Sequence, residues 1–531
     1  MLFVSPSPLQ HFSPPHTSKA KAMRDMYSPS RSPHFMGPSK PISKPRSIYK
    51  IPVEIWQHIF LFFSSFEGIP ELEEIESSLG RPTQTPSSAR GRNMIPHSPL
   101  VLTQVCRHWR AISLNLPELW TSLFVKGPDL LFGTDHYTLQ RKLQNRSQAI
   151  KYRLSLSKTL KLKICISCDR VQDAKQLIHA IMPFSKRWDV LSLQVPLEAL
   201  SELSMMTSRD TPSLTSLRIQ PPAVPGPKGA SPMLSFNPFH LITTSPSLKS
   251  LSCSVLPSPM TFKSLEFLEE LRLDLNPCET MSTLYLLQSC SQLRKLTLSG
   301  NGVTDRGYEQ PEHPLVLTHL ETLSLEHPVG RQSLLRSLSL PRLRHVWLGG
   351  RCGPGAGAST LLLKELKDLM QRSDVWSLES LVVALENHSP RPDLFLSFLA
   401  SNPDLKTLRI DDTWNSTKPV INSNLLRALT LPEPQLQSAG MDSRCILLPR
   451  LRRVSLVMCP NNVEQDLARF LYSRSIRTDY TTPLKSIQLS SKRRLSSGLI
   501  SAIESHRRRG SNVLLRFAEQ NPNEDWLAFR T

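Results

Sequence analysis

Residues 105–120, VCRHWRAISLNLPELW, bring together side-chain types that could do chemistry. Cys106, His108 and Trp109 could act as a nucleophile, a base and a stacking residue. The alternative is a helix on which Cys106 and Trp109, three residues apart, share a buried face while the basic residues around them are more exposed. Because an unpaired cysteine behaves as a small hydrophobic residue, we expect the buried arrangement.

Three further clusters each lack part of the set of residues that a reactive site needs. Cys165 and Cys168 form a lone CxxC pair, whereas a zinc site needs four ligands, so we expect incidental cysteines at a strand end. Residues 349–360, GGRCGPGAGAST, lack the Gly-Lys-Ser/Thr ending of a phosphate-binding loop. Asp411 and Asp412 could hold a cation or act as acid and base, but no third acidic ligand is evident and we expect them to be solvated. The sequence therefore predicts a non-catalytic chain with no cofactor and no metal.

Composition narrows the compartment and the class of partner. The chain has 531 residues and a net charge of +20, but its Lys and Arg are scattered without interleaved aromatic residues, so nucleic acid is not the expected partner. No apolar run approaches the roughly 18 residues of a membrane span, so no membrane is expected as a partner. The N-terminal residues, MLFVSPSPLQHFSPP, lack the basic region of a secretory signal. We therefore expect a cytoplasmic or nuclear protein with reduced cysteines.

The choice between cytoplasm and nucleus stays open at this point. Residues 492–494 and 507–509 are spaced like a bipartite nuclear import signal. Alternatively, residues 496–510, SSGLISAIESHRRRG, form an ordinary helix whose terminal Arg cluster suits the helix dipole. Gly510 then suits the position just after the helix, and VLLRF that follows is the last strand.

The N-terminal quarter of the chain has two parts. Residues 1–47 are rich in Ser and Pro and basic, a composition that predicts a disordered tail. A small helical domain is expected at 48–125, interrupted by a loop at 65–97 where the apolar periodicity is lost. The helical pattern resumes at Pro99.

The first helix is predicted over residues 51–63, IPVEIWQHIFLFF. Its start fits Pro52, because the first helical turn needs no N–H from that residue. Ile55, Ile59 and Phe62 or Phe63 recur at helical spacing and form an apolar stripe.

From about residue 160 the chain repeats one pattern: an apolar residue, two variable residues, an apolar one, a variable one and a further apolar one. Examples are PSLTSLRI (212–219), FLEELRLD (267–274) and SQLRKLTLS (291–299). The pattern recurs mostly every 20 to 35 residues, and such a recurrence predicts a solenoid, placed at 150–520. One unit buries too little apolar surface to fold alone, so stacked units must share a core.

Helices are predicted between the strands. The clearest segments are 359–371, 393–401 and 463–474. Residues 422–432, NSNLLRALTLP, are ambiguous between a helix and a further strand. We expect a helix with Ser423 or Asn424 as its cap.

Each predicted strand places one outward residue between two inward apolar residues, because side chains alternate with period two. These outward residues are Arg218, Ser252, Arg272, Thr297, Ser324, Trp347, Val382, Arg409, Ser455 and Gln488. An exposed Trp among several Arg is the composition of a binding hot spot, so Arg218, Arg272, Trp347 and Arg409 are the candidate target-binding residues. The alternative makes Trp347 an isolated surface aromatic.

Residues 293–303, LRKLTLSGNGV, match the full consensus of leucine-rich repeats, including Asn301, and the repeated units together resemble that family. The resemblance implies an α/β fold, with a curved parallel sheet, helices on the outside and a concave binding face.

The segments IPVEIWQHIF, VCRHWRAI and LPELWTSL resemble an F-box, and in particular the large F-box families of mushroom-forming fungi. Ile51 replaces the leading Leu of that pattern. The matching residues are Pro52, Glu54, Ile55, Ile59, Phe60, Val105, Cys106, Arg107, Trp109 and Arg110.

This second resemblance implies a non-catalytic substrate receptor of a ubiquitin ligase. Its helices would dock on a Skp-type adaptor that is tied to a cullin-RING ligase, and its repeats would bind an unknown protein target. The expected adaptor-binding residues are Pro52, Ile55, Ile59, Val105 and Trp109. The alternative is an adaptor-independent scaffold in which the helical domain caps the solenoid.

Overall fold

A computed structural model describes the chain in sixteen segments. They are 51–66, 99–128, 136–221, 245–254, 265–274, 280–299, 313–326, 332–351, 358–375, 378–386, 391–412, 419–431, 446–459, 463–475, 481–491 and 496–517. The predicted tail at 1–47, most of the inserted loop at 65–97, Asn301 and the basic cluster at 492–494 lie outside them. Contacts divide the chain into two units, Met1–Ile55 and Trp56–Thr531.

Within the second unit, the described residues form one long parallel sheet whose strands follow each other in sequence order. The strands are β1 (Ser122–Lys126), β2 (Leu162–Ser167), β3 (Trp188–Gln194), β4 (Ser216–Gln220), β5 (Ser250–Cys253), β6 (Glu270–Asp274), β7 (Lys295–Ser299), β9 (Thr322–Glu326), β11 (His345–Arg351), β12 (Ser380–Glu386), β13 (Thr407–Asp411), β14 (Arg453–Cys459), β15 (Ser486–Ser491) and β16 (Asn512–Phe517). A separate parallel pair consists of β8 (Leu315–Val316) and β10 (Leu338–Ser339).

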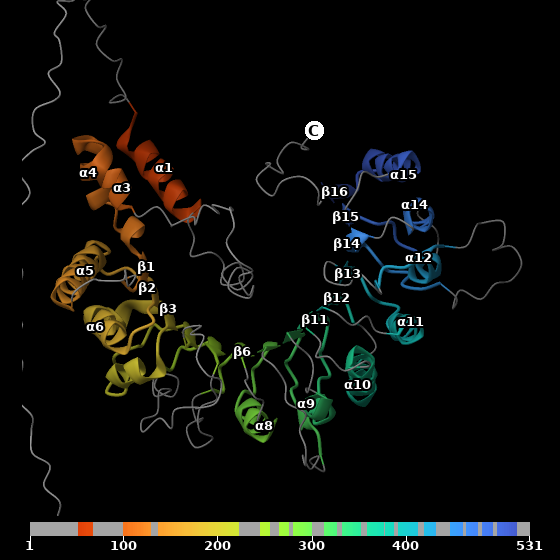
Figure 1. Ribbon diagram of the computed structural model, residues 1–531, viewed down its shortest axis with the longest axis horizontal. Helices are drawn as coiled ribbons and strands as arrows, with labels where there is room; N and C mark the ends of the chain where they lie inside the picture. The colour runs from red at the N-terminus through yellow and green to blue at the C-terminus, as the bar shows by residue number, and fades with distance from the viewer. Residues whose placement is uncertain are drawn as a thin grey trace, which may run out of the picture. The chain divides into compact units, whose positions relative to one another are not determined.

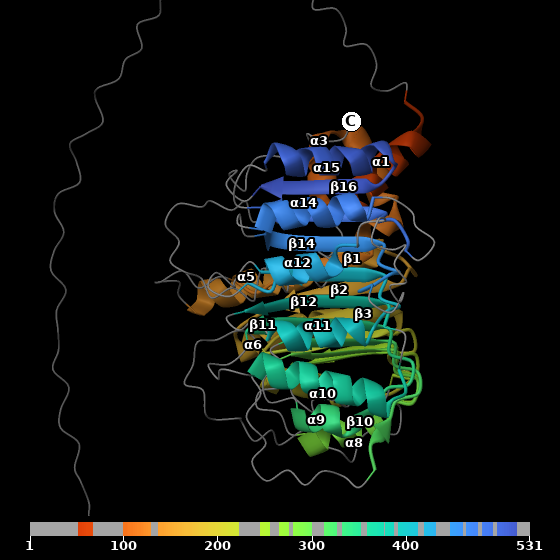
Figure 2. The same cartoon turned by 90° about the vertical axis from the view of Figure 1, so that its right-hand side faces the viewer.

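Helices connect many of these strands. The α-helices described after β1 are α5 (His136–Leu156), α6 (Val171–Ile181), α8 (Thr280–Gln288), α9 (Gln332–Arg336), α10 (Ala358–Arg372), α11 (Pro392–Ala400), α12 (Ser423–Leu429), α14 (Glu464–Ser473) and α15 (Ser497–Arg508). Short 3-10 helices are η3 (Met182–Arg187) and η4 (Leu197–Leu203). Figure 1 shows the strands of the sheet on the inner side of its curve and the helices outside. Figure 2 shows α10, α11, α12, α14 and α15 stacked in sequence order.

The apolar residues of the repeated pattern form the core between the sheet and the helices. One buried cluster runs without interruption from Leu123 to Ile503. Typical strands bury alternate side chains, as β9 does with Leu323 and Leu325. Burial of each Leu contributes roughly 1.5–3 kcal/mol to the free energy of folding. One repeat buries too few leucines to become ordered alone, so the repeats must share a core.

The predicted solenoid with a parallel sheet and outer helices is therefore confirmed, with two differences in detail. The sheet begins at β1, earlier than the predicted start at 150, within the range expected for the helical domain. The ambiguous segment is a helix, α12, but its N-cap is Asn422, whose side chain accepts the N–H of Leu425, and not Ser423 or Asn424. The last strand β16 and the helix before it, with Gly510 at positive φ, are as predicted.

Candidate protein-interaction surfaces

In the part of the chain that the structure describes, four helices precede the sheet. They are α1 (Val53–Phe66), α3 (Leu100–Val105), α4 (Arg107–Leu114) and the 3-10 helix η2 (Pro117–Trp120). In the second unit their buried side chains form a core of their own that includes Phe60 and Trp120. The indole N–H of Trp120 donates to the carbonyl oxygen of Ser113 at 2.8 Å, so this large side chain is both packed and hydrogen bonded.

Three aromatic rings hold α1 to α4. The ring centroid of Trp109 lies 5.0 Å from that of Trp56 and 5.0 Å from that of Phe60. The two α1 rings are 6.0 Å apart, one helical turn from each other. These separations are those of favourable aromatic pairs. Trp109 is therefore a half-buried member of the core, and it supports the surface of this helical domain from beneath.

The predicted apolar stripe of α1 is not the face that packs on this core. Ile59 is 44% exposed and Phe62 is 64% exposed, while Trp56 and Phe60 are buried. Before the boundary at Ile55, both Pro52 and Ile55 are exposed. The helix is thus apolar on two faces, and the aromatic face, which is not part of the predicted stripe, is signalled by the i, i+4 spacing of Trp56 and Phe60.

Helix α3 also leaves apolar side chains in solvent. Leu100 and Val101 are each 45% exposed, and Val105 is 56% exposed, whereas Leu102 is buried. Helices α1 and α3 thus both carry exposed apolar side chains.

Cys106 corrects the prediction of one continuous buried helix over this stretch. Its backbone is extended, with φ −156 and ψ 170, and it separates α3 from α4. The thiol is exposed, and its sulfur accepts the N–H of Trp109 at 3.4 Å. Cys106 therefore caps α4, and a capping residue lies outside the helix while it satisfies one of the N–H groups of the first turn, here that of Trp109. A role in the core does not fit this exposed position.

The strand face is the side of the sheet that faces away from the helices. Strand register places the predicted outward residues in one continuous row across it, because each is paired with the next on the neighbouring strand. The row runs through Arg218, Ser252, Arg272, Thr297, Ser324, Trp347, Val382, Arg409, Ser455 and Gln488. The ten positions therefore lie in register on neighbouring strands.

The arginine side chains of the row are buried or form ion pairs, which the sequence did not indicate. Arg218 is buried, at 5% exposure, so its position faces outward but its guanidinium does not reach solvent as expected. Arg272 donates to the carboxylate of Glu326, two strands away, at 2.8 Å. Arg409 lies 3.8 Å from the carboxylate of Asp411, and its side chain is 47% exposed. Of the three arginines, Arg409 is the one most accessible to a partner.

Trp347 is half-buried and not exposed as predicted. Its indole lies along strand β11 over Gly349, where an added β-carbon would stand 2.3 Å from a ring carbon. The neighbours of these residues on β12 are Val382 and Ala384. The strand face therefore carries a small apolar area at this point, with the indole flat upon it.

The other candidate clusters have structural explanations. Burial raises the pKa of both Cys165 and Cys168, which keeps these thiols protonated. Asp412 is buried and not solvated as expected, because its carboxylate accepts the N–H groups of Val420 and Ile421 at 3.1 and 2.7 Å. Within the described segments, no group of three His, Cys, Asp or Glu side chains could hold a metal ion. In the same segments, no helix has the length and apolar character of a membrane span.

A line of charged residues runs along the edge of the sheet where the strands begin. We call it the charge ladder; it consists of Lys249, Glu269, Arg294, Glu321, Arg344, Glu379, Lys406, Arg452 and Lys485. The N–H of each residue after the first donates to the carbonyl oxygen of the one before it, at 2.7 to 2.9 Å. The signs alternate from Lys249 to Lys406. This regularity is visible in the sequence, since each residue directly follows the first apolar residue of its repeat, but it was not among the predicted features.

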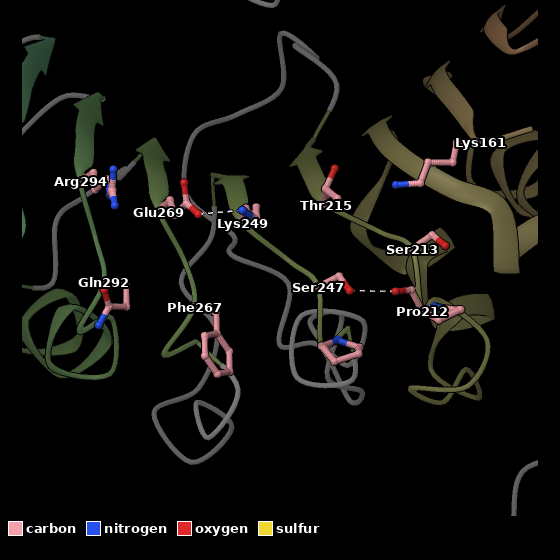
Figure 3. A pocket seen from close by; sticks show the side chains of 11 residues that line it. Lys161, Pro212, Ser213, Thr215, Ser247, Lys249, Phe267, Glu269, Gln292 and Arg294 are labelled. Atoms are coloured by element: carbon pink, nitrogen blue, oxygen red, sulfur yellow. Dashed lines mark hydrogen bonds and ion pairs between the residues drawn. The ribbon is translucent and has the colours of Figure 1, made fainter.

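A groove of about 650 Å³ opens along the first part of this edge. Figure 3 shows Lys249 and Glu269 in contact, with their side-chain atoms 2.9 Å apart, beside Arg294. The neighbouring cations lower the pKa of Glu269, chiefly through the hydrogen bond from Lys249. Phe267, at 66% exposure, is the largest apolar side chain in the groove. Charges of opposite sign are thus paired in this part of the ladder.

No family model and no curated protein matches this sequence. Among solved structures, the chain is similar to an internalin from Listeria monocytogenes, with a TM-score of 0.29 and 13% identity, covering 79% of this chain and 93% of the internalin. It is also similar to TLR13 in a complex with ssRNA13, with a TM-score of 0.32 and 15% identity, covering 68% of this chain and 49% of that one. The assignment of a solenoid rests on the strand order and register of the sheet itself.

Proposed function

We propose that this chain is the substrate-recognition subunit of a Skp-cullin-F-box ubiquitin ligase. In this function the helical domain binds a Skp-type adaptor, and the strand face of the solenoid binds the target protein. The chain itself catalyses nothing; it brings the target to the ligase.

The observation that carries this proposal is the division of the F-box-like residues between core and surface. Phe60 and Trp109 pack on each other, while Ile59 and Val105 stay 44% and 56% exposed. A helical domain that only had to fold would favour polar residues at such positions. An adaptor that covers Ile59 and Val105 would gain roughly 1.5–3 kcal/mol for each side chain that becomes fully buried.

Co-purification with the Skp-type adaptor tests the proposal. The double variant Ile59→Glu, Val105→Glu should remain folded, because both side chains are exposed, and should lose the adaptor. Ile500→Glu is the matched control, since Ile500 on α15 is an isoleucine with the same 44% exposure. Adaptor capture that survives the double variant, or that is lost equally in the control, contradicts the proposed role of the helical domain.

A second function is favoured by the way the helical domain meets the sheet. Leu156, the last residue of α5, packs against the core of that domain, and β1 directly follows η2. The domain could therefore serve as the N-terminal cap that a solenoid requires, in an adaptor-independent interaction scaffold. In that case the wild-type chain captures no adaptor, and removal of residues 51–120 exposes the first strands and lowers the stability of the solenoid.

A further inference from the structure

The alternation of charge along the ladder stops near its C-terminal end. From Lys249 to Lys406, each cation is followed by a carboxylate on the next strand, as the Lys406–Glu379 pair at 3.0 Å illustrates. After Lys406 come Arg452 and then Lys485, so three successive positions are cationic. Arg453, the first residue of β14, adds a fourth charge beside them, between the uncharged Thr407 and Ser486.

The backbone fixes these cations on adjacent strands. The N–H of Arg452 donates to the carbonyl of Lys406 at 2.8 Å, and the N–H of Lys485 donates to the carbonyl of Arg452 at 2.7 Å. Neighbouring strands are about 4.8 Å apart, and like charges directly opposite one another in a sheet destabilise it. The fold tolerates here a repulsion that the rest of the ladder avoids. Such departures from a locally favourable pattern are typical of functional sites.

The nearby carboxylates are already engaged with other cations. Asp404 lies 2.7 Å from Arg450. Asp411 lies next to Arg409, and Glu379 next to Lys406. Within the described segments, no carboxylate forms an ion pair with the remaining cations. We call these Arg452, Arg453 and Lys485 the basic edge, and all three side chains are exposed.

We propose that the basic edge binds an extended peptide segment of the target that carries clustered carboxylates. This inference rests on the proposed receptor function and specifies the chemistry of its target. A segment that crosses the beginnings of β14 and β15 would meet exposed cations at both strands. The two arginines can each bind a carboxylate through two N–H groups, which gives geometric selectivity as well as attraction.

The surroundings favour a peptide over a single-stranded nucleic acid. Such nucleic acids are held by aromatic side chains that stack on the bases as well as by cations. The exposed large aromatic residues of the described segments do not lie on β13, β14 or β15; the nearest in sequence is Tyr472 on α14. Among the residues that the structure describes, the basic edge therefore offers charge without an exposed aromatic side chain on the same strands.

The test uses the full chain and a short fluorescein-labelled peptide of alternating Glu and Ser, with fluorescence anisotropy as the readout. The variant Arg452→Gln, Arg453→Gln, Lys485→Gln should bind this peptide about tenfold more weakly. The matched control, Lys249→Gln, Arg294→Gln, Arg344→Gln, removes the same charge from the alternating part of the ladder and should keep most of the affinity. A peptide with Gln in place of Glu should not bind.

Several outcomes overturn the inference. They are an equal loss in both triple variants, wild-type binding of the Gln peptide, or tighter binding of a single-stranded oligonucleotide of equal charge. The thermal unfolding midpoint of the basic-edge variant should match or exceed that of the wild type, because repulsion is removed, and this separates loss of binding from loss of fold.

Adaptor capture is scored in the same preparations. A chain that captures adaptor but no acidic peptide refutes this inference alone, and a chain that captures peptide but no adaptor refutes the proposed function alone.

Discussion

The indole of Trp347 occupies the space that a β-carbon on residue 349 would need, and Gly349 makes this possible. An ideal β-carbon there would stand 2.3 and 2.4 Å from two ring carbons, far inside van der Waals contact. Both residues project from strand β11 to the strand face, two positions apart, so the ring lies along its own strand. Gly349 is not among the glycines with positive φ, and its role is to leave room for the ring.

This relationship predicts strong coupling between the two positions. Gly349→Ala should lower the free energy of unfolding by about 1–3 kcal/mol, because the ring must move off its place on the strand. In a Trp347→Ala background the same substitution should cost little, since the clash is gone. Chemical denaturation of the wild type, both single variants and the double variant measures this coupling. Additive effects would show that the ring does not depend on Gly349.

Truncation of Trp109 in the core of the helical domain should reduce both the stability of this domain and adaptor capture. Trp109→Ala removes the ring that contacts both Trp56 and Phe60, and such truncations cost about 3–5 kcal/mol. Adaptor capture should therefore be lost together with the fold of this domain. Protease sensitivity of residues 99–121 measures the unfolding, and Val105→Ala is the control for this readout alone, because it shortens an exposed side chain of the same domain. Capture that persists in a locally unfolded chain would count against the F-box assignment.

The solenoid could be predicted because each repeat carries its own pattern of apolar residues within a few positions of the sequence. Side chains of a strand alternate with period two, so the leucines of each repeat determine which residue faces outward. Arg272 and Thr297 were aligned in this way, and they are register partners on β6 and β7. The burial of Arg218 could not be predicted in the same way, since the pattern assigns a residue to a face but not how closely its neighbours cover it.

The helical domain was harder to predict for a related reason. Helix α1 carries apolar residues on two faces, and periodicity alone does not show whether Ile59 or Phe60 packs inside. The break at Cys106 was missed because Cys is not among the usual N-cap residues, and a sulfur cap leaves no familiar trace in the sequence. Which face of α1 packs inside depends on its contact with Trp109 of α4, which is a tertiary interaction.

The strand face yields a prediction about target choice. Replacing Trp347, Arg272 and Arg409 together with Ala or Ser should leave adaptor capture intact and remove a subset of the co-purified proteins. Trp347 and Arg409 matter most for this effect, since Arg272 is already paired with Glu326. Quantitative mass spectrometry of the co-purified proteins is the measurement. An unchanged set of partners would move the target site away from this row.

Replacement of Arg474, which belongs neither to the helical domain nor to the row on the strand face, should have a large effect on stability. Its guanidinium is buried, and it donates to the main-chain carbonyls of Leu429, Leu447 and Leu448. Burial lowers its pKa to about 10. Arg474→Met should lower the free energy of unfolding by about 3 kcal/mol or more, because three acceptors lose their donor. Arg469→Met, on the same helix but with a 72% exposed side chain, should change it far less. Urea denaturation compares the two, and equal effects would show that the buried hydrogen bonds are not the cause.

His506 predicts how the stability of the last repeats depends on pH. Burial lowers the pKa of this imidazole below its ordinary value of 6.5, and its Nε2 donates to the carbonyl oxygen of Leu471 at 2.7 Å, joining α15 to α14. As the pH falls below about 6.5, the unfolded chain takes up a proton that the folded chain resists, so the unfolded state is favoured. The contribution of His506 to stability should therefore be complete above about pH 6.5 and decrease below it.

His506→Gln keeps an N–H for the same carbonyl and cannot titrate in this range. Thermal unfolding midpoints from about pH 7.5 down to about pH 5 should fall less steeply for this variant than for the wild type. Parallel pH profiles would show that another group controls the stability.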